Sequence, residues 1–218
     1  MVTHALPTNK FLGIRETPHE GCFPLSEAVI CTDDNDYRVV GIAAGMLADD
    51  VERVTGSRPQ LSKTKTLPKG TALVAGTLGH SRLIDQLVSK QKIDVTGIKD
   101  KWESFVLMST EHPQYHTPLL VIIGSDRRGT AYGLTSLSEA IGVSPWYWWA
   151  DVTPAHKTAL YVEPGVYRQE EPSVKYRGIF INDERFGGWA RWAEQRYGKV
   201  GPEVYQKVFE LLLRLKAN

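Results

Sequence analysis

The first segment that could carry chemistry is Asn182-Asp183-Glu184, which directly follows the apolar run 179–181. Polar side chains at the carboxyl ends of strands form the active-site face of parallel barrels. Two carboxylates beside an amide suit acid–base chemistry or contacts to sugar hydroxyls. The same side chains could instead be loop charges that cap a turn, and the pattern alone favours neither interpretation.

A second segment is the aromatic run Trp-Tyr-Trp-Trp at residues 146–149, which is followed by Asp151. Aromatic rings stack on the C–H faces of sugars, and indole N–H and phenol O–H groups reach hydroxyls, so Trp148 and Trp149 are candidate substrate-binding residues. A core plug between two domains would use the same residues, and the large area that aromatic side chains bury favours the plug. The two interpretations are compatible if the plug lines a pocket.

A third segment, Gly-Ser-Asp-Arg-Arg-Gly-Thr at residues 124–130, is only superficially similar to a phosphate-binding loop. It lacks the lysine that reaches the phosphates, which disfavours a nucleotide-binding domain. We expect Ser125 or Asp126 to cap the helix that follows.

Histidine and cysteine residues give weaker signals. His112 and His116 lie four residues apart, but Pro113 between them argues against a helix with both on one face, so we expect no metal site. Cys22 and Cys31 could be bridged in a secreted protein or could be two free thiols, and the sequence leaves both open.

The elements that must position these residues alternate between strands and helices up to about residue 141. Apolar periodicity predicts an order β-α-β-α-β-β-α, which is typical of a sheet with helices packed on it. The predicted strands cover residues 28–31, 71–75, 105–108 and 119–123, and the predicted helices cover residues 39–54, 83–88 and 130–141. The short loop between the last two strands predicts an antiparallel pair.

The rest of the chain changes character after residue 150. Prolines break residues 151–173 into extended pieces, with a small hairpin expected around Gly165. The contiguous apolar residues within 176–181 predict a strand buried on both faces, as in a parallel sheet. Arg177 inside that strand would need a carboxylate partner. A helix with Pro202 at its start follows, and one strand with one helix cannot bury both faces, so the sequence looks cut off inside a second domain.

Composition sets broad limits on function. The chain has 218 residues, 42% of them hydrophobic, which is enough for a core and corresponds to one or two domains. The 26 basic residues nearly balance the 25 acidic ones, so bulk electrostatics indicates neither a nucleic-acid nor a membrane surface. The first thirty residues show no export signal pattern.

Four motifs resemble glycoside hydrolase family 115 when they are taken together. They are GSDRRGTAYG at 124–133, GVSPWYWWADV at 142–152, YRGIFINDE at 176–184 and FELLLRLKAN at 209–218. The resemblance implies an α/β fold: an N-terminal sheet-and-helix sandwich domain (1–150), a linker (151–173) and the first βα unit of a truncated (β/α)8 catalytic barrel (174–218).

The resemblance also implies an activity, the inverting removal of (4-O-methyl)glucuronic acid linked α-1,2 to xylan. The catalytic candidates are then Asp183 and Glu184, without an assignment of acid and base, and the substrate-binding candidates are Asn182, Trp148, Trp149 and Arg177. An inverting enzyme holds its acid and base roughly 6.5–9.5 Å apart, so we expect at least one catalytic carboxylate from beyond Asn218 and no turnover by this chain alone.

The family resemblance sets the remaining expectations as well. We expect glucuronoxylan or its oligosaccharides as the partner, no cofactor, no metal, no nucleic acid and no membrane. The resemblance implies an extracellular protein, and a homodimer is one candidate state of the full-length protein. The alternative function is a non-catalytic carbohydrate-binding module that uses the aromatic run 146–149.

Overall fold

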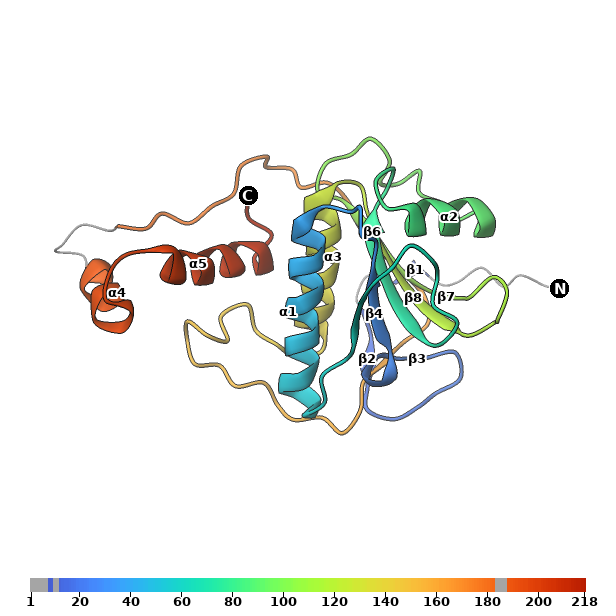
Figure 1. Cartoon of the computed structure of the whole chain (residues 1–218), viewed down its shortest axis with the longest axis horizontal. Coiled ribbons are helices and arrows are strands. Elements are labelled where there is room, and N and C mark those ends of the chain that lie inside the picture. The colour runs from blue at the N-terminus through green and yellow to red at the C-terminus, as the bar shows by residue number, and fades with distance from the viewer. Residues whose placement is uncertain (1–7, 10–11, 183–187) are drawn as a thin grey trace. The chain divides into compact units, whose positions relative to one another are not determined.

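The computed structural model describes residues 8–9, 12–182 and 188–218 of the chain. These residues form two compact units, Met1–Pro172 and Ser173–Asn218, which we call the α/β unit and the C-terminal unit. Figure 1 shows the helices and strands of both. In the described part of the chain, no helix combines the length and the apolar character needed to cross a membrane.

The α/β unit is built on one large mixed sheet. Within the described residues this sheet has seven strands in the order β1-β10-β7-β8-β6-β4-β5. Their bounds are β1 Thr8–Asn9, β4 Val29–Thr32, β5 Leu61–Lys63, β6 Ala72–Thr77, β7 Phe105–Glu111, β8 Pro118–Gly124 and β10 Val166–Gln169. Strands β5, β4, β6 and β8 run parallel, whereas β7 is antiparallel to both β8 and β10. The mixed α/β fold is as predicted, and the antiparallel pairing of β7 with β8 is confirmed.

Helices cover both faces of the sheet (Figure 1). Helices α1 (Arg38–Thr55) and α3 (Arg127–Ala140) lie on one face, and α2 (Arg82–Gln91) lies on the other. Side chains alternate between the faces along each strand, so Val74 of β6 and Val121 of β8 join Leu87 of α2 in a buried cluster. The buried aliphatic side chains on both faces supply the main driving force for this unit, because each contributes roughly 1.5–3 kcal/mol.

The predicted helices are confirmed, and their apolar faces are the buried ones. Val40, Ala43, Leu47, Val51 and Val54 of α1 are fully or almost fully buried. Their spacing of three and four residues places them on one stripe of the helix, which is why the periodicity was sufficient to locate it.

Helix α3 approaches the sheet closely because of its glycines. A Cβ added at Gly129 would lie 2.1 Å from the carbonyl oxygen of Ser104, and one at Gly133 would lie 2.4 Å from a methyl carbon of Ile122. Both distances are far below a van der Waals contact. The glycines of the segment 124–133 therefore serve the packing of α3 on β7 and β8.

A second, smaller sheet was not predicted. Within the described residues it has three strands in the order β2-β9-β3, namely β2 Ile14–Arg15, β3 Phe23–Pro24 and β9 Tyr161–Val162. The hairpin expected around Gly165 is wrong, because β9 pairs with β2 and β3 whereas β10 pairs with β7 and β1. Gly165 therefore lies where the chain passes from one sheet to the other.

The C-terminal unit has two described helices, α4 (Trp189–Tyr197) and α5 (Pro202–Arg214). Helix α5 confirms the predicted start at Pro202, and Val204, Val208 and Leu211 on its apolar face are buried. Within the helix, Glu210 forms ion pairs with Lys207 at 3.1 Å and with the buried Arg214 at 3.0 Å.

The strand predicted at 176–181 is wrong for the described structure. These residues are extended but belong to no strand, and the side chains of Tyr176 and Phe180 are 80% and 89% exposed. A parallel strand needs hydrogen-bonding neighbours and covering layers, and the described residues of this unit provide neither. The (β/α)8 barrel stays a prediction from the family resemblance.

Candidate functional site

The predicted catalytic residues Asp183 and Glu184 lie outside the described residues. Asn182, the third member of that motif, is exposed and ends the described segment 173–182. The catalytic and substrate-binding roles of these three residues therefore stay predictions.

Arg177 fixes the segment that leads to this motif. Its guanidinium donates from Nε and Nη2 to the carbonyl oxygen of Lys216 at 2.9 and 2.7 Å, and from Nη1 to that of Val174 at 2.7 Å. The backbone N–H of Asn218 donates to the carbonyl oxygen of Arg177 at 2.9 Å. All of these acceptors are backbone carbonyls, and the carboxylate partner that the sequence suggested for Arg177 stays a prediction. Arg177 thus ties residues 174–177 to the turn after α5, and its substrate-binding role stays a prediction.

The aromatic run 146–149 lies in the α/β unit, between α3 and β9. Trp148 and Trp149 are half-buried and meet edge to face, with ring centroids 4.8 Å apart. Tyr147 lies under the Arg53 guanidinium of α1 at 4.4 Å, a cation–π contact that attaches the run to the helix. Trp146 is 43% exposed. Half-buried rings are consistent with both interpretations of the run, as core packing and as a substrate-binding surface for sugars.

The turn from β8 into α3 is a helix cap. The Asp126 carboxylate accepts hydrogen bonds from the backbone N–H of Gly129 at 2.7 Å and of Glu103 at 2.9 Å. Glu103 is buried and pairs with Arg128 at 3.3 Å. Two carboxylates thus occupy the N-terminal end of α3, where a nucleotide phosphate would have to bind, and their charge disfavours such a ligand.

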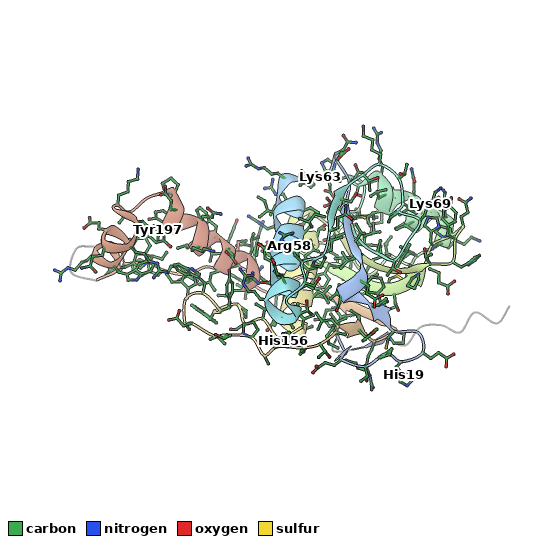
Figure 2. All side chains as sticks on the ribbon, turned by 60° about the horizontal axis from the view of Figure 1, so that its bottom comes forward. His19, Arg58, Lys63, Lys69, His156 and Tyr197 are labelled. Carbon is green, nitrogen blue, oxygen red and sulfur yellow. The ribbon has the colours of Figure 1, made fainter. Side chains whose placement is uncertain are left out.

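A cavity of about 630 Å³ in the α/β unit is a feature that the sequence did not predict. Its walls come from the connection between β5 and β6, from α2 and from the loop between β7 and β8. They include Lys65, Lys69, Lys90, His112 and Tyr115. We call it the lysine cavity. Lys69, one of the lining residues, is labelled in Figure 2. Its volume falls within the roughly 300–1,000 Å³ typical of small-ligand pockets.

His112 organises one wall of the lysine cavity. Its ring Nδ1 accepts hydrogen bonds from the backbone N–H of Gln114 at 3.1 Å and of Tyr115 at 3.2 Å. Burial lowers the pKa of His112 below its ordinary value, and the positive charges of Lys90 and His116 lower this pKa further. A neutral imidazole is the form that accepts at Nδ1, so the lowered pKa and the hydrogen bonds agree.

Metal-ligating side chains and thiols were also candidates for chemistry. No group of three or more His, Cys, Asp or Glu side chains that could hold a metal ion occurs among the residues the structure describes. Cys22 and Cys31 are both free thiols, Cys22 half-buried and Cys31 buried. Burial raises the pKa of the Cys31 thiol to about 11, which leaves it protonated and unreactive at neutral pH.

Comparisons with known proteins give the family. The sequence model of Glycosyl hydrolase family 115 matches residues 169–218. The structure of BtGH115A is described as that of a family GH115 4-O-methyl-alpha-glucuronidase with specificity for decorated arabinogalactans. It shares 34% sequence identity with this chain at a TM-score of 0.75, and the match covers 90% of this chain and 25% of that chain. No curated protein matches this chain.

Two further structures match at lower similarity. CpGH84D shares 8% identity over 94% of this chain and 35% of that chain. A mutant beta-hexosaminidase of Streptomyces plicatus shares 16% identity over 88% of this chain and 31% of that chain. Both have a TM-score of 0.46, which is too low to support an argument about this chain.

The matched segment and the similarity to BtGH115A define the class of protein as glycoside hydrolase. Within that class, the chain belongs to glycosyl hydrolase family 115, and it spans about a quarter of the length of BtGH115A.

Proposed function

We propose that this chain is part of an α-glucuronidase that removes (4-O-methyl)glucuronic acid from a decorated glycan. The observation that supports the proposal is the 34% identity to BtGH115A over 90% of this chain. The chain carries the motif Asn182-Asp183-Glu184 within the segment that the family model matches.

The proposed reaction is inverting hydrolysis at an α-1,2 linkage to xylose in glucuronoxylan. One carboxylic acid protonates the leaving oxygen while a carboxylate on the other side activates water, and the two groups lie roughly 6.5–9.5 Å apart. Asp183 and Glu184 are adjacent in sequence, so in this proposal one of them works with a carboxylate from outside the 218 residues. The 218-residue chain alone then has no turnover. We further propose that the protein is extracellular.

The substrate class can be tested with a chimera in which residues 1–218 replace the matching quarter of BtGH115A. The proposal predicts release of 4-O-methylglucuronic acid from glucuronoxylan by the chimera. Unmodified BtGH115A is the control, and a cooperative thermal transition shows that the chimera is folded. A folded chimera without activity on any uronic-acid-decorated glycan would overturn the proposal. Activity on decorated arabinogalactan alone would support the proposed glucuronidase activity but contradict glucuronoxylan as its substrate.

A second candidate function is a non-catalytic carbohydrate-binding module, which the 43% exposure of Trp146 beside Trp148 and Trp149 favours. It predicts saturable binding of the chain to xylan that is lost on Trp148→Ala or Trp149→Ala while the fold persists. Unchanged binding in folded variants would exclude this use of the aromatic run.

A further inference from the structure

The lysine cavity carries an excess of positive charge. Lys65, Lys69 and Lys90 are among its lining residues, and no Asp or Glu is. Across residues 8–9, 12–182 and 188–218, none of the three ammonium groups has a carboxylate within ion-pair distance. Glu111 at the end of β7 pairs instead with His116 at 3.4 Å. Ammonium groups that line one cavity without acidic partners give it a positive potential, and a positive potential favours an anionic ligand.

The wall around these lysines is held in place by the fold. Two hydrogen bonds to His112 fix the backbone of the loop between β7 and β8. The Thr117 hydroxyl donates to the carbonyl oxygen of Lys69 at 3.0 Å, which joins that loop to the connection between β5 and β6. The Lys69 ammonium lies 5.5 Å from the ring centroid of Tyr115. An ordered wall lowers the entropic cost of binding a ligand.

The lining also has apolar surface. Leu67, Pro113 and Tyr115 are among the residues that line the same cavity. A ligand that fits both features has a negative charge attached to a body with an apolar face. A pyranose ring bearing a carboxylate has this composition, since its C–H face is apolar and its carboxylate accepts charge-assisted hydrogen bonds from lysine.

We propose that the lysine cavity of the α/β unit binds a uronic acid residue of an acidic glycan. The carboxylate contacts Lys69 and Lys90, and the sugar ring lies against the apolar part of the wall. The choice of a uronic acid among carboxylate ligands rests on the proposed function, whereas the preference for an anion rests on the lysines. The α/β unit then binds a decorated glycan chain.

Binding to the 218-residue chain tests this proposal directly. The probes are xylotriose carrying 4-O-methylglucuronic acid, neutral xylotriose and inorganic phosphate, each titrated by calorimetry at low ionic strength. We expect the acidic oligosaccharide to bind at least about tenfold more tightly than either control ligand, and to weaken as salt is added. Equal affinity for neutral xylotriose, or equal affinity for phosphate, would overturn the proposal.

A pair of matched double variants locates the site. Lys69→Gln with Lys90→Gln removes two positive charges from the cavity, and Lys63→Gln with Lys99→Gln removes two exposed charges that do not line it. The first should weaken binding of the acidic oligosaccharide by about tenfold or more, and the second by less than about twofold, because charge-assisted contacts act at short range. Equal losses in both folded variants would overturn the assignment.

Failure of this proposal can be told apart from failure of the proposed function. Binding is measured on the chain without any turnover, whereas the function is measured as product release by the chimera. If the chimera hydrolyses the substrate but the 218-residue chain binds no acidic oligosaccharide, the proposed binding at the lysine cavity is wrong and the proposed glucuronidase function stands. Changes in the backbone amide chemical shifts of Lys90 and Tyr115 on titration with the acidic oligosaccharide would support binding in the lysine cavity.

Discussion

His112 and Tyr115 are joined twice in the loop between β7 and β8. The Nδ1 of His112 accepts a hydrogen bond from the backbone N–H of Tyr115 at 3.2 Å, and the two rings lie with their centroids 4.8 Å apart. The same nitrogen accepts from Gln114. One buried imidazole thus holds the backbone that presents Tyr115 to the lysine cavity.

Protonation of His112 should therefore destabilise the protein at mildly acidic pH. The pKa of this histidine is lowered in the folded state, so the unfolded chain binds more protons as the pH falls below about 6.5. The stabilising contribution is complete above about pH 6.5 and is lost as the pH falls toward the folded-state pKa. Urea unfolding between pH 7.5 and 5 measures the slope, which should shrink in the variant His112→Ala.

Two variants separate this effect from general titration. At pH 7.5, His112→Ala should lower the free energy of unfolding by about 1–3 kcal/mol, because two backbone N–H groups lose their acceptor. His116→Asn is the control, since His116 is exposed and Asn tolerates its φ of 55°. We expect that change to stay within about 0.5 kcal/mol. Equal losses in both variants, or an unchanged pH slope in His112→Ala, would contradict this role of His112.

Gly129 is required for the packing of α3 on the sheet. The variant Gly129→Ala places a methyl group 2.1 Å from the carbonyl oxygen of Ser104, so the helix or the strand must shift. We expect a loss of roughly 2–3 kcal/mol in the free energy of unfolding. Gly45 of α1 is the matched control, because a Cβ there meets nothing within 4 Å, and Gly45→Ala should change stability little or raise it by up to about 1 kcal/mol. Chemical unfolding of both variants measures these changes. A Gly129→Ala variant with an unchanged free energy of unfolding would contradict the packing role of Gly129.

The two thiols should differ in reactivity. The half-buried Cys22 should react with a thiol reagent at pH 8 in the folded protein, whereas Cys31, whose pKa is raised to about 11 by burial, should react after unfolding. Cys22→Ser should abolish the early reaction. Because the folded state holds the Cys31 proton, stability should also fall as the pH rises above about 9. Two thiols reacting at one rate in the folded protein would contradict the structure.

The sequence was sufficient for elements with a clear periodicity. The apolar stripe of α1 repeats over several helical turns, and β7 and β8 each contain a contiguous run of buried apolar residues. Strands of two residues, such as β2 and β9, carry no such pattern. Their pairing joins Ile14 to Val162, which are brought together only by the tertiary fold.

The candidate site was predictable only in part. The motif at 182–184 stands out by its residue types. The apolar run 179–181 before it predicted a strand, and this prediction was wrong because an apolar run does not show whether neighbouring strands exist. Lys65, Lys69 and Lys90 each look like ordinary solvated charges in the sequence. They form one cavity because the fold brings the end of α2 beside the connection that precedes β6.

The proposal that this chain supplies a catalytic carboxylate to a glucuronidase can be tested by measuring kcat/KM in the BtGH115A chimera. Asp183→Asn and Glu184→Gln keep the size of each side chain but remove its acid–base capacity. We expect at least one of them to lower kcat/KM on glucuronoxylan by about 10²–10⁴-fold while oligosaccharide binding persists. Activity within about twofold of the unmodified chimera in both variants would contradict a catalytic role of Asp183 and Glu184, because neither carboxylate would then take part in proton transfer.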